Sequence, residues 1–115
     1  MTTSDAWIEF DGRRVALDAE GHLANPADWS PAVAVALAER DGVGLGDDHW
    51  WLIEFVRDHY HRYGTVPLMR QAIMAWRRAS GDDTIGSREL YRLLPDGPIR
   101  LACRYAGLPA PESCI

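Results

Sequence analysis

The sequence predicts an α+β fold: a small antiparallel β-hairpin or meander, packed on an array of about five helices and followed by a flexible C-terminal arm. Strand-like runs come first and helical hydrophobic spacing follows, an order typical of α+β folds. The 115 residues show no repeat and no linker composition. We therefore expect a single domain, 1–115, with a hairpin region over 1–24, a helical array over 30–106 and a mobile cysteine-bearing arm over 107–115.

The β-hairpin is predicted from two short strand-like runs joined by a tight turn. Residues 7–10 and 13–17 flank the dipeptide Asp11-Gly12. Asp-Gly favours a two-residue type I′ turn, because both central residues of that turn need positive φ. A second turn at 18–21 leads to an expected third short strand at 22–23.

The first two helices are predicted from their end signals. Ser30-Pro31 supplies an N-cap and a first-turn proline for a helix over 32–40. Asp47 or Asp48 is expected to cap a second helix that runs to about residue 63 and ends at Gly64.

The second helix is rich in aromatic residues. Its main apolar stripe follows helical spacing and consists of Trp50, Ile53, Val56, Tyr60 and Tyr63. Trp51 and Phe55 lie outside this stripe, so we expect the helix to be buried on two sides. A surface for a partner protein is the alternative interpretation of these aromatic residues.

Proline and serine mark the starts of three further helices. Pro67 is expected to start a helix that runs to about residue 78. Ser87 is expected to cap a short helix over 88–93. Pro98 begins a last helix, which carries Cys103 and ends at Gly107.

Composition and charge narrow the classes of function. No apolar run approaches the length of about 18 residues that a membrane span needs, and the first residues lack the pattern of a secretory signal. We therefore expect a cytoplasmic protein with reduced thiols. The formal net charge is −5, and all twelve cationic residues are Arg. The acidic excess lies in residues 1–60, whereas the cysteine-bearing half is net positive.

The sequence contains two cysteines, Cys103 and Cys114, with ten residues between them. Two cysteines are too few for a disulfide scaffold, which leaves redox or sulfur chemistry or no special role. Arg100 and Arg104 flank Cys103, and nearby cations lower the pKa of a thiol and raise its thiolate fraction. The same cations would stabilise a persulfide or an oxyanion. The structural alternative is that Cys103 is a small core residue and Cys114 has no function.

The segment after the last helix has the composition of an extended arm. Gly107 permits a sharp change of direction, and Pro109 and Pro111 favour extended backbone. Cys114 is the next-to-last residue, where we do not expect burial. The arm would present its thiol to a partner or fold back onto Cys103, because ten intervening residues easily bridge the Cα separation of a disulfide, about 5.5 Å.

Other classes of site have weaker support. The four histidines lack metal-ligand spacing, so we expect no metal site, and no cofactor motif is present. Two helices joined at 63–67 would fit a helix-turn-helix regulator with a redox cysteine pair, and Arg70, Arg77 and Arg78 make its second helix basic. The acidic net charge argues against nucleic acid as a partner. Hydrolase, P-loop and dinucleotide motifs are absent.

The C-terminal third of the chain carries a specific motif. Residues 90–98 read Leu-Tyr-Arg-Leu-Leu-Pro-Asp-Gly-Pro, and they are followed by Ala102-Cys103, by Ala-Gly-Leu-Pro at 106–109, by Pro111 and by Cys114-Ile115. This pattern resembles the DsrC/TusE family of sulfur-relay proteins. Upstream residues match the family in order and approximate spacing: Trp29-Ser30, His49-Trp50, Phe55-Val-Arg-Asp58, Tyr60, Pro67, Arg70 and Gly86-Ser-Arg88.

The resemblance implies a function as well as a fold. It implies a sulfurtransferase-type carrier without a conventional active site, which takes sulfur as a persulfide on Cys114. DsrC-type members have a second cysteine, here Cys103, can bridge the two cysteines through sulfur, and serve dissimilatory sulfite reductase. TusE-type members typically lack that cysteine and pass sulfur toward 2-thiouridine in tRNA. Cys103 therefore favours the DsrC type, with sulfur-donating and sulfur-accepting proteins as partners and without membrane insertion.

The chain departs from the family pattern at five positions: Asp96, Leu101, Ala110, Glu112 and Ser113. The family often has Lys or Gln at the first three of these positions and Gly at the last. Less positive charge and less glycine would change partner docking and arm mobility. These departures make a divergent paralogue in another sulfur pathway one alternative. A plain structural subunit, in which neither cysteine acts, is a separate alternative.

Overall fold

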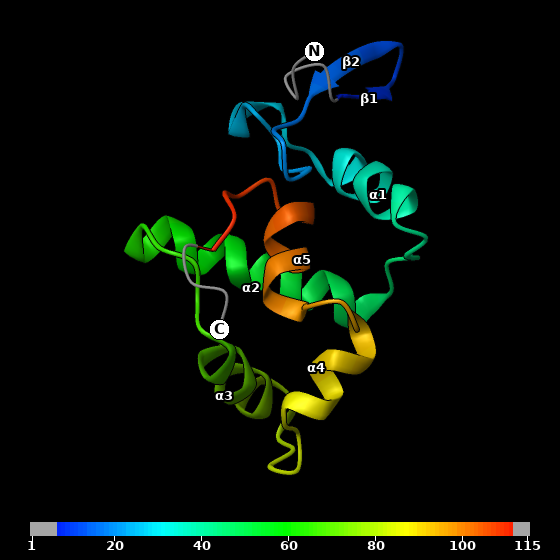
Figure 1. Ribbon diagram of the computed structural model, residues 1–115. Coiled ribbons are helices and arrows are strands. Elements are labelled where there is room, and N and C mark those ends of the chain that lie inside the picture. The colour runs from blue at the N-terminus through cyan, green and yellow to red at the C-terminus, as the bar shows by residue number, and fades with distance from the viewer. Residues whose placement is uncertain (1–6, 112–115) are drawn as a thin grey trace.

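A computed structural model describes residues 7–111 of the chain; residues 1–6 and 112–115 are not described. The elements follow the predicted order of a hairpin and then helices (Figure 1). They are β1 (Trp7–Phe10), β2 (Arg13–Ala16), a 3-10 helix η2 (Pro26–Asp28), α1 (Pro31–Arg40), α2 (Asp47–Tyr63), α3 (Met69–Ser80), α4 (Ser87–Leu93) and α5 (Pro98–Tyr105). The predicted α+β class is confirmed.

The hairpin has the predicted turn. β1 and β2 pair antiparallel, and Phe10 lies opposite Arg13 across a two-residue loop. Asp11 and Gly12 have φ of 53° and 75°, the positive values that a type I′ turn requires. The expected third strand is reduced to a single bridge between Leu17 and Leu23.

Helix ends follow local chemistry, with small shifts from the prediction. The Ser30 hydroxyl accepts a hydrogen bond from the Val33 backbone N–H, as an N-cap does, and α1 begins at Pro31. Gly64 adopts the left-handed conformation that ends α2. The N-cap of α2 is Gly46 and that of α4 is Gly86, each one residue before the expected serine or aspartate.

The third helix begins two residues later than predicted, at Met69. Pro67 is buried, and the cap residue is Leu68. The Gln71 side chain accepts a hydrogen bond from the Leu68 N–H, which satisfies one of the free donors at the start of the helix. Gln71 therefore fixes the start that the proline alone was expected to set.

The last helix lies at the centre of the fold. α5 packs against α1, α2 and α4, and Figure 1 shows it between α1 and the long α2. Its buried face meets the core side chains Leu52, Ile53 and Val56 of α2. A residue on α5 is therefore held by several elements at once.

α2 is buried on two sides, as its aromatic residues predicted. Trp51 stacks on Phe55 and on Trp76 of α3, with ring centroids 5.4 and 5.9 Å apart. The predicted main stripe is wrong at one end, because Tyr63 is 66% exposed. Tyr63 is the last residue of α2, and its ring contacts that of His59.

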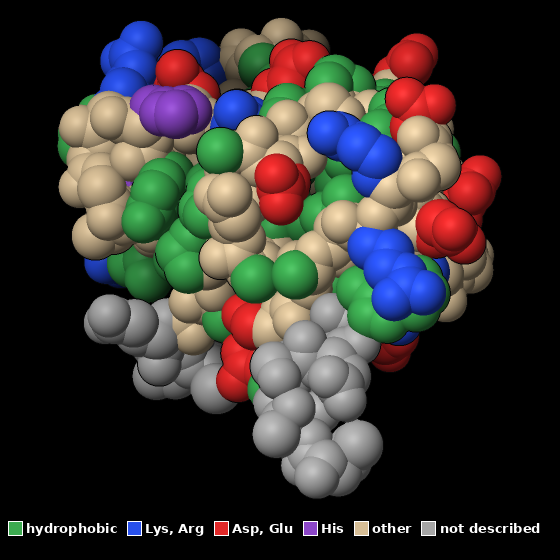
Figure 2. All heavy atoms as spheres, turned by 90° about the horizontal axis from the view of Figure 1, so that it is seen from above, with side chains coloured by type: hydrophobic (Ala, Val, Ile, Leu, Met, Phe, Trp, Pro, Cys, Tyr) green, Lys and Arg blue, Asp and Glu red, His purple; other side chains and the backbone are tan. Residues whose placement is uncertain are grey.

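Charges of both signs are interspersed on the surface. On the face seen in Figure 2, acidic and basic side chains lie among hydrophobic ones, without one large patch of a single sign. Within residues 7–111, no helix is both long and apolar enough to cross a bilayer.

Candidate functional site

Cys103 lies in the hydrophobic core. It sits on the buried face of α5 with none of its surface exposed. Burial raises the pKa of the Cys103 thiol from 9.0 to about 12, because the thiolate would lose its hydration. The expectation that neighbouring arginines lower this pKa is therefore wrong for the folded state described here. Desolvation of the buried thiol is the cause of the rise in its pKa.

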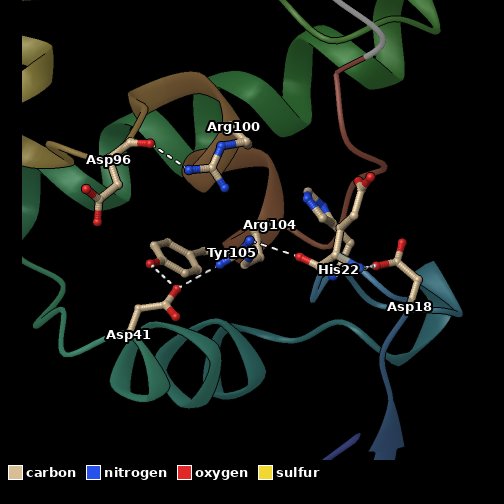
Figure 3. A network of polar contacts seen from close by, with 8 residues as sticks. Asp18, His22, Asp41, Asp96, Arg100, Arg104 and Tyr105 are labelled. Carbon is tan, nitrogen blue, oxygen red and sulfur yellow. Dashed lines mark hydrogen bonds and ion pairs between the residues drawn. The ribbon is translucent and has the colours of Figure 1, made fainter. Parts of the chain in front are cut away.

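The two arginines beside Cys103 are engaged elsewhere (Figure 3). Arg100 donates through Nη2 to the backbone oxygen of Asp96 at 2.6 Å. Arg104 donates through Nη1 to the Asp41 carboxylate at 3.1 Å and through Nη2 to the backbone oxygen of Glu20 at 2.9 Å. These contacts draw both guanidinium groups toward α1 and the loops, so neither group is directed at the Cys103 sulfur.

Asp41 joins α1 to α5. Its Oδ2 accepts hydrogen bonds from the Tyr105 hydroxyl, at 2.8 Å, and from Arg104. Burial and the hydrogen bond to Asp41 raise the pKa of Tyr105, so the phenol stays neutral and donates. The Arg104 Nε is buried and has no hydrogen-bond partner within residues 7–111. Only part of the Arg104 guanidinium is therefore satisfied.

Two small pockets border the Arg104–Asp41 pair. The larger has a volume of about 390 Å³ and is lined by Asp41, Val43, Leu94, Pro95, Asp96, Arg100, Leu101 and Arg104. The smaller, of about 170 Å³, includes Asp18, Arg40, Asp41 and Arg104. Both contain cations and carboxylates, so the lining of each carries charges of both signs.

The end of α5 is held by side chains from three other segments. Trp29 donates through Nε1 to the backbone oxygen of Tyr105 at 2.7 Å, and Arg57 donates through Nη1 to that of Ala106 at 2.8 Å. The Nδ1 of the buried His22 lies 2.9 Å from the backbone oxygen of Leu108. Since a carbonyl only accepts, this nitrogen carries the proton.

These three residues also contact the arm base and one another. The Arg57 guanidinium lies 3.8 Å from the centroid of the Trp29 ring, a cation–π contact. Gly107 lies directly against the same ring, so that an added Cβ would come within 2.6 Å of it. From the sequence, His22 is expected in a short third strand and not in a metal site, and Trp29 and Arg57 enter only through the resemblance to the family. Local spacing gives no sign that they meet at one helix end.

The expected arm, 107–115, begins with packed residues. Gly107 is buried, Leu108 is only 6% exposed, and the Leu108 N–H donates to the Cys103 oxygen at 3.0 Å. Pro109 is the first exposed residue after α5. Cys114 lies outside the described residues, so its assigned role stays a prediction.

The helix pair α2–α3 has little of the free basic surface that DNA reading requires. Arg77 donates through Nε to the backbone oxygen of Ile85 at 2.6 Å, which directs it to the loop before α4. Arg70 and Arg78 are exposed, but Leu68 and Met74 on the same segment are exposed and apolar.

Within residues 7–111, no three His, Cys, Asp or Glu side chains gather as metal ligands would.

Comparisons with known proteins identify the family and agree with the fold. The family described as "DsrC like protein" matches residues 9–115, so this chain belongs to the DsrC-like family, and the resemblance stated from sequence is confirmed. The sulfurtransferase TusE of Yersinia pestis is 44% identical over 94% of this chain and 99% of its own length. TusE of Escherichia coli K12 is 41% identical over 92% and 97%.

Solved structures of DsrC proteins share the whole fold. The NMR structure of Allochromatium vinosum DsrC is 41% identical, covers 95% of this chain and 97% of its own, and has a TM-score of 0.83. The crystal structure of the oxidized γ-subunit of dissimilatory sulfite reductase, DsrC, from Archaeoglobus fulgidus is 31% identical, with a TM-score of 0.86 and coverage of 96% and 100%.

Proposed function

We propose that this protein is a sulfur carrier, which holds sulfur as a persulfide on Cys114 and passes it between partner proteins of dissimilatory sulfur metabolism. The match over residues 9–115, which includes both cysteines, is the observation that carries the proposal. It is supported by relatives that are named sulfurtransferases and by structural neighbours named as sulfite reductase subunits. As a carrier, the protein supplies the attacking and leaving sulfur atoms, and its partners catalyse the transfer.

Loading is a thiol-exchange step on Cys114. The Cys114 thiolate attacks the terminal sulfur of a donor persulfide, a bond forms between these two sulfur atoms, and the donor leaves as its own thiolate. Cys114 then carries one added sulfur, and no electrons are gained or lost overall. The step needs an accessible thiolate, which is the role we assign to the segment beyond Pro109.

Cys103 is the residue that resolves the persulfide. Its thiolate attacks the Sγ of Cys114, and the added sulfur leaves as hydrosulfide while a disulfide joins the two cysteines. Two cysteine sulfurs are oxidised and the transferred sulfur is reduced. With a pKa of about 12, the buried Cys103 stays protonated near neutral pH, so this step follows an opening that hydrates the thiol.

Arg100 and Arg104 are assigned to stabilise the negative sulfur once the helix end has opened. Both guanidinium groups lie within one turn of Cys103 on α5, and charge-assisted hydrogen bonds favour a thiolate, a persulfide or an oxyanion. In the structure described here, with Cys103 buried, Arg100 donates to the backbone oxygen of Asp96 and Arg104 donates to the Asp41 carboxylate. Sulfur chemistry at Cys103 therefore competes with these two acceptors.

A TusE-type relay toward tRNA thiolation is the second candidate, and the 44% identity to a curated TusE favours it. The two candidates differ in what they require of Cys103. A relay that hands the persulfide directly to an acceptor needs only Cys114, whereas reductive release of hydrosulfide needs both thiols. The variant Cys103→Ala separates them: it keeps transfer to an acceptor in a relay and loses the disulfide-linked release.

The test of the carrier function is the intact mass of the protein after incubation with a persulfide donor. Wild type should gain the mass of one sulfur atom, and a reducing agent should remove it. Cys114→Ala should gain none, and Cys103→Ala should still be loaded. Equal loading of Cys114→Ala would overturn the assignment of the carrier cysteine.

A further inference from the structure

The backbone carbonyl groups at the end of α5 accept hydrogen bonds from side chains of three other segments. The last carbonyls of a helix lack partners within the helix, and water, a cap or a side chain must satisfy them. Here the oxygens of Tyr105, Ala106 and Leu108 each meet a side-chain donor from a different segment. We name the donors His22, Trp29 and Arg57 together the clamp. Simple capping needs no such convergence.

The clamp is built from strong contacts. The Arg57 charge lies at the negative end of the α5 dipole, where a cation is favoured, and its hydrogen bond is charge-assisted. The Trp29 side chain contacts both Arg57 and Gly107, and it leaves no room for a larger residue at 107. Partial burial of Arg57 lowers its pKa but leaves it charged at neutral pH.

The clamp anchors the chain beside Cys103. Leu108 is buried and tied through its oxygen to His22 and through its N–H to Cys103, whereas Pro109 is exposed. The chain is therefore anchored next to Cys103 as far as Leu108, and Pro109 is the first exposed residue after it. Five residues lie between Leu108 and Cys114, so their Cα atoms can be at most about 20 Å apart when the chain is fully extended.

We propose that His22, Trp29 and Arg57 are positioning residues for sulfur exchange: they anchor the chain at Leu108 and keep Cys103 closed until the clamp is released. This inference rests on the proposed function, because it assigns the clamp to the step between the two cysteines. Leu108 covers the helix end beside Cys103, so release of its carbonyl and N–H opens the path to the sulfur. A partner that competes for the Arg57 or Trp29 donors would start exchange between the cysteines.

The first measurement is alkylation of Cys103 by iodoacetamide in the native protein, followed by peptide mass analysis. A buried thiol reacts through transient opening, so its rate reports the free energy of that opening. Arg57→Gln removes a charge-assisted hydrogen bond, and Trp29→Phe keeps a ring but removes the N–H donor. Each should raise the Cys103 rate about tenfold or more, with no change at Cys114.

Two control variants separate the clamp from general destabilisation. Arg62→Gln removes a charge from an exposed pair on the same helix, α2, and should leave the rate unchanged. Gly81→Ala loosens the end of α3, where an added Cβ meets no atom within 4 Å, and its effect on Cys103 should follow global stability alone. If the clamp variants raise the rate only as much as Gly81→Ala does at equal loss of stability, the clamp has no positioning role.

The second measurement is closure of the cysteine bridge with oxidised glutathione. Cys114 first exchanges to give its glutathione mixed disulfide, and the Cys103 thiolate then displaces glutathione thiolate to form the Cys103–Cys114 disulfide. Clamp variants should speed the second step and not the first. Unchanged closure would overturn the inference. Neither measurement uses a sulfur donor, so equal persulfide loading of Cys114→Ala would refute the carrier function while leaving the clamp result intact.

Discussion

Two separate constraints require glycine at position 107, one from the backbone conformation and one from packing. Its φ of 74° lies in the left-handed region, which costs residues with a Cβ about 1–2 kcal/mol. The same position faces the Trp29 side chain so closely that a Cβ would lie 2.6 Å from Cδ1. Trp29 cannot retreat without losing its hydrogen bond to the Tyr105 oxygen. The glycine is therefore required by packing as well as by backbone conformation.

Gly107→Ala should destabilise the protein more than the same change at Gly81. Gly81 has a similar φ, 70°, but open space around the added Cβ, so Gly81→Ala should cost about 1 kcal/mol from backbone conformation alone. Gly107→Ala adds an overpacking cost of about 1–3 kcal/mol. Urea unfolding of both variants measures the difference. Equal losses would show that Trp29 moves aside at little cost.

At the scale of elements, one carboxylate links the first and last helices. Asp41 caps the end of α1 and accepts hydrogen bonds from two residues of α5, Arg104 and Tyr105. The Arg104–Asp41 pair is half-buried, so it is less screened than a surface pair. Without the Asp41 carboxylate, the Arg104 Nη1 and the buried Tyr105 hydroxyl lose the acceptor of their hydrogen bonds.

Asp41→Ala should lower the free energy of unfolding by about 1–3 kcal/mol, the cost of buried donors left without an acceptor. Asp58→Ala is the matched control, because its exposed pair with Arg62 is worth about 0–1 kcal/mol. Thermal unfolding of both variants checks the contrast. Similar small losses would mean that water replaces Asp41 as the acceptor.

The elements that sequence predicts well are those fixed within a few residues. The Asp11-Gly12 turn, the Ser30 cap and the Gly64 stop depend on local backbone chemistry, and each is where the pattern places it. The resemblance to one family also came from a contiguous motif. Cys103 was harder to predict: its neighbours in sequence are cationic, but its neighbours in space are apolar side chains from other helices.

The clamp could not be predicted for the same reason. His22, Trp29 and Arg57 lie between 49 and 86 residues away from the carbonyls they contact. No spacing rule connects a loop histidine to a helix end that far along the chain. Long-range contacts of this kind arise only once α5 is surrounded by α1, α2 and the segment after the hairpin.

At the scale of the whole molecule, the Cys103 thiol is buried on the central helix α5, so its protonation is linked to the free energy of unfolding. Cys103 and Tyr105 are both buried in their neutral forms, and burial raises the pKa of each. The unfolded chain releases these protons at lower pH than the folded chain does. Stability supplied by the neutral thiol is therefore complete below pH about 9 and declines as pH rises toward 12.

Alkaline pH should therefore unfold the protein, and removal of the Cys103 thiol should weaken this dependence. Between pH 9 and 12, Cys103 contributes a slope of up to about 1.4 kcal/mol per pH unit, because the unfolded state binds fewer protons. Cys103→Ala should reduce the decline by that amount and retain the part due to Tyr105. Urea unfolding at several pH values, in a Cys114→Ala background that prevents disulfide exchange, measures both slopes. Identical slopes with and without Cys103 would mean that the thiol ionises in the folded protein as readily as in the unfolded chain, which contradicts its burial.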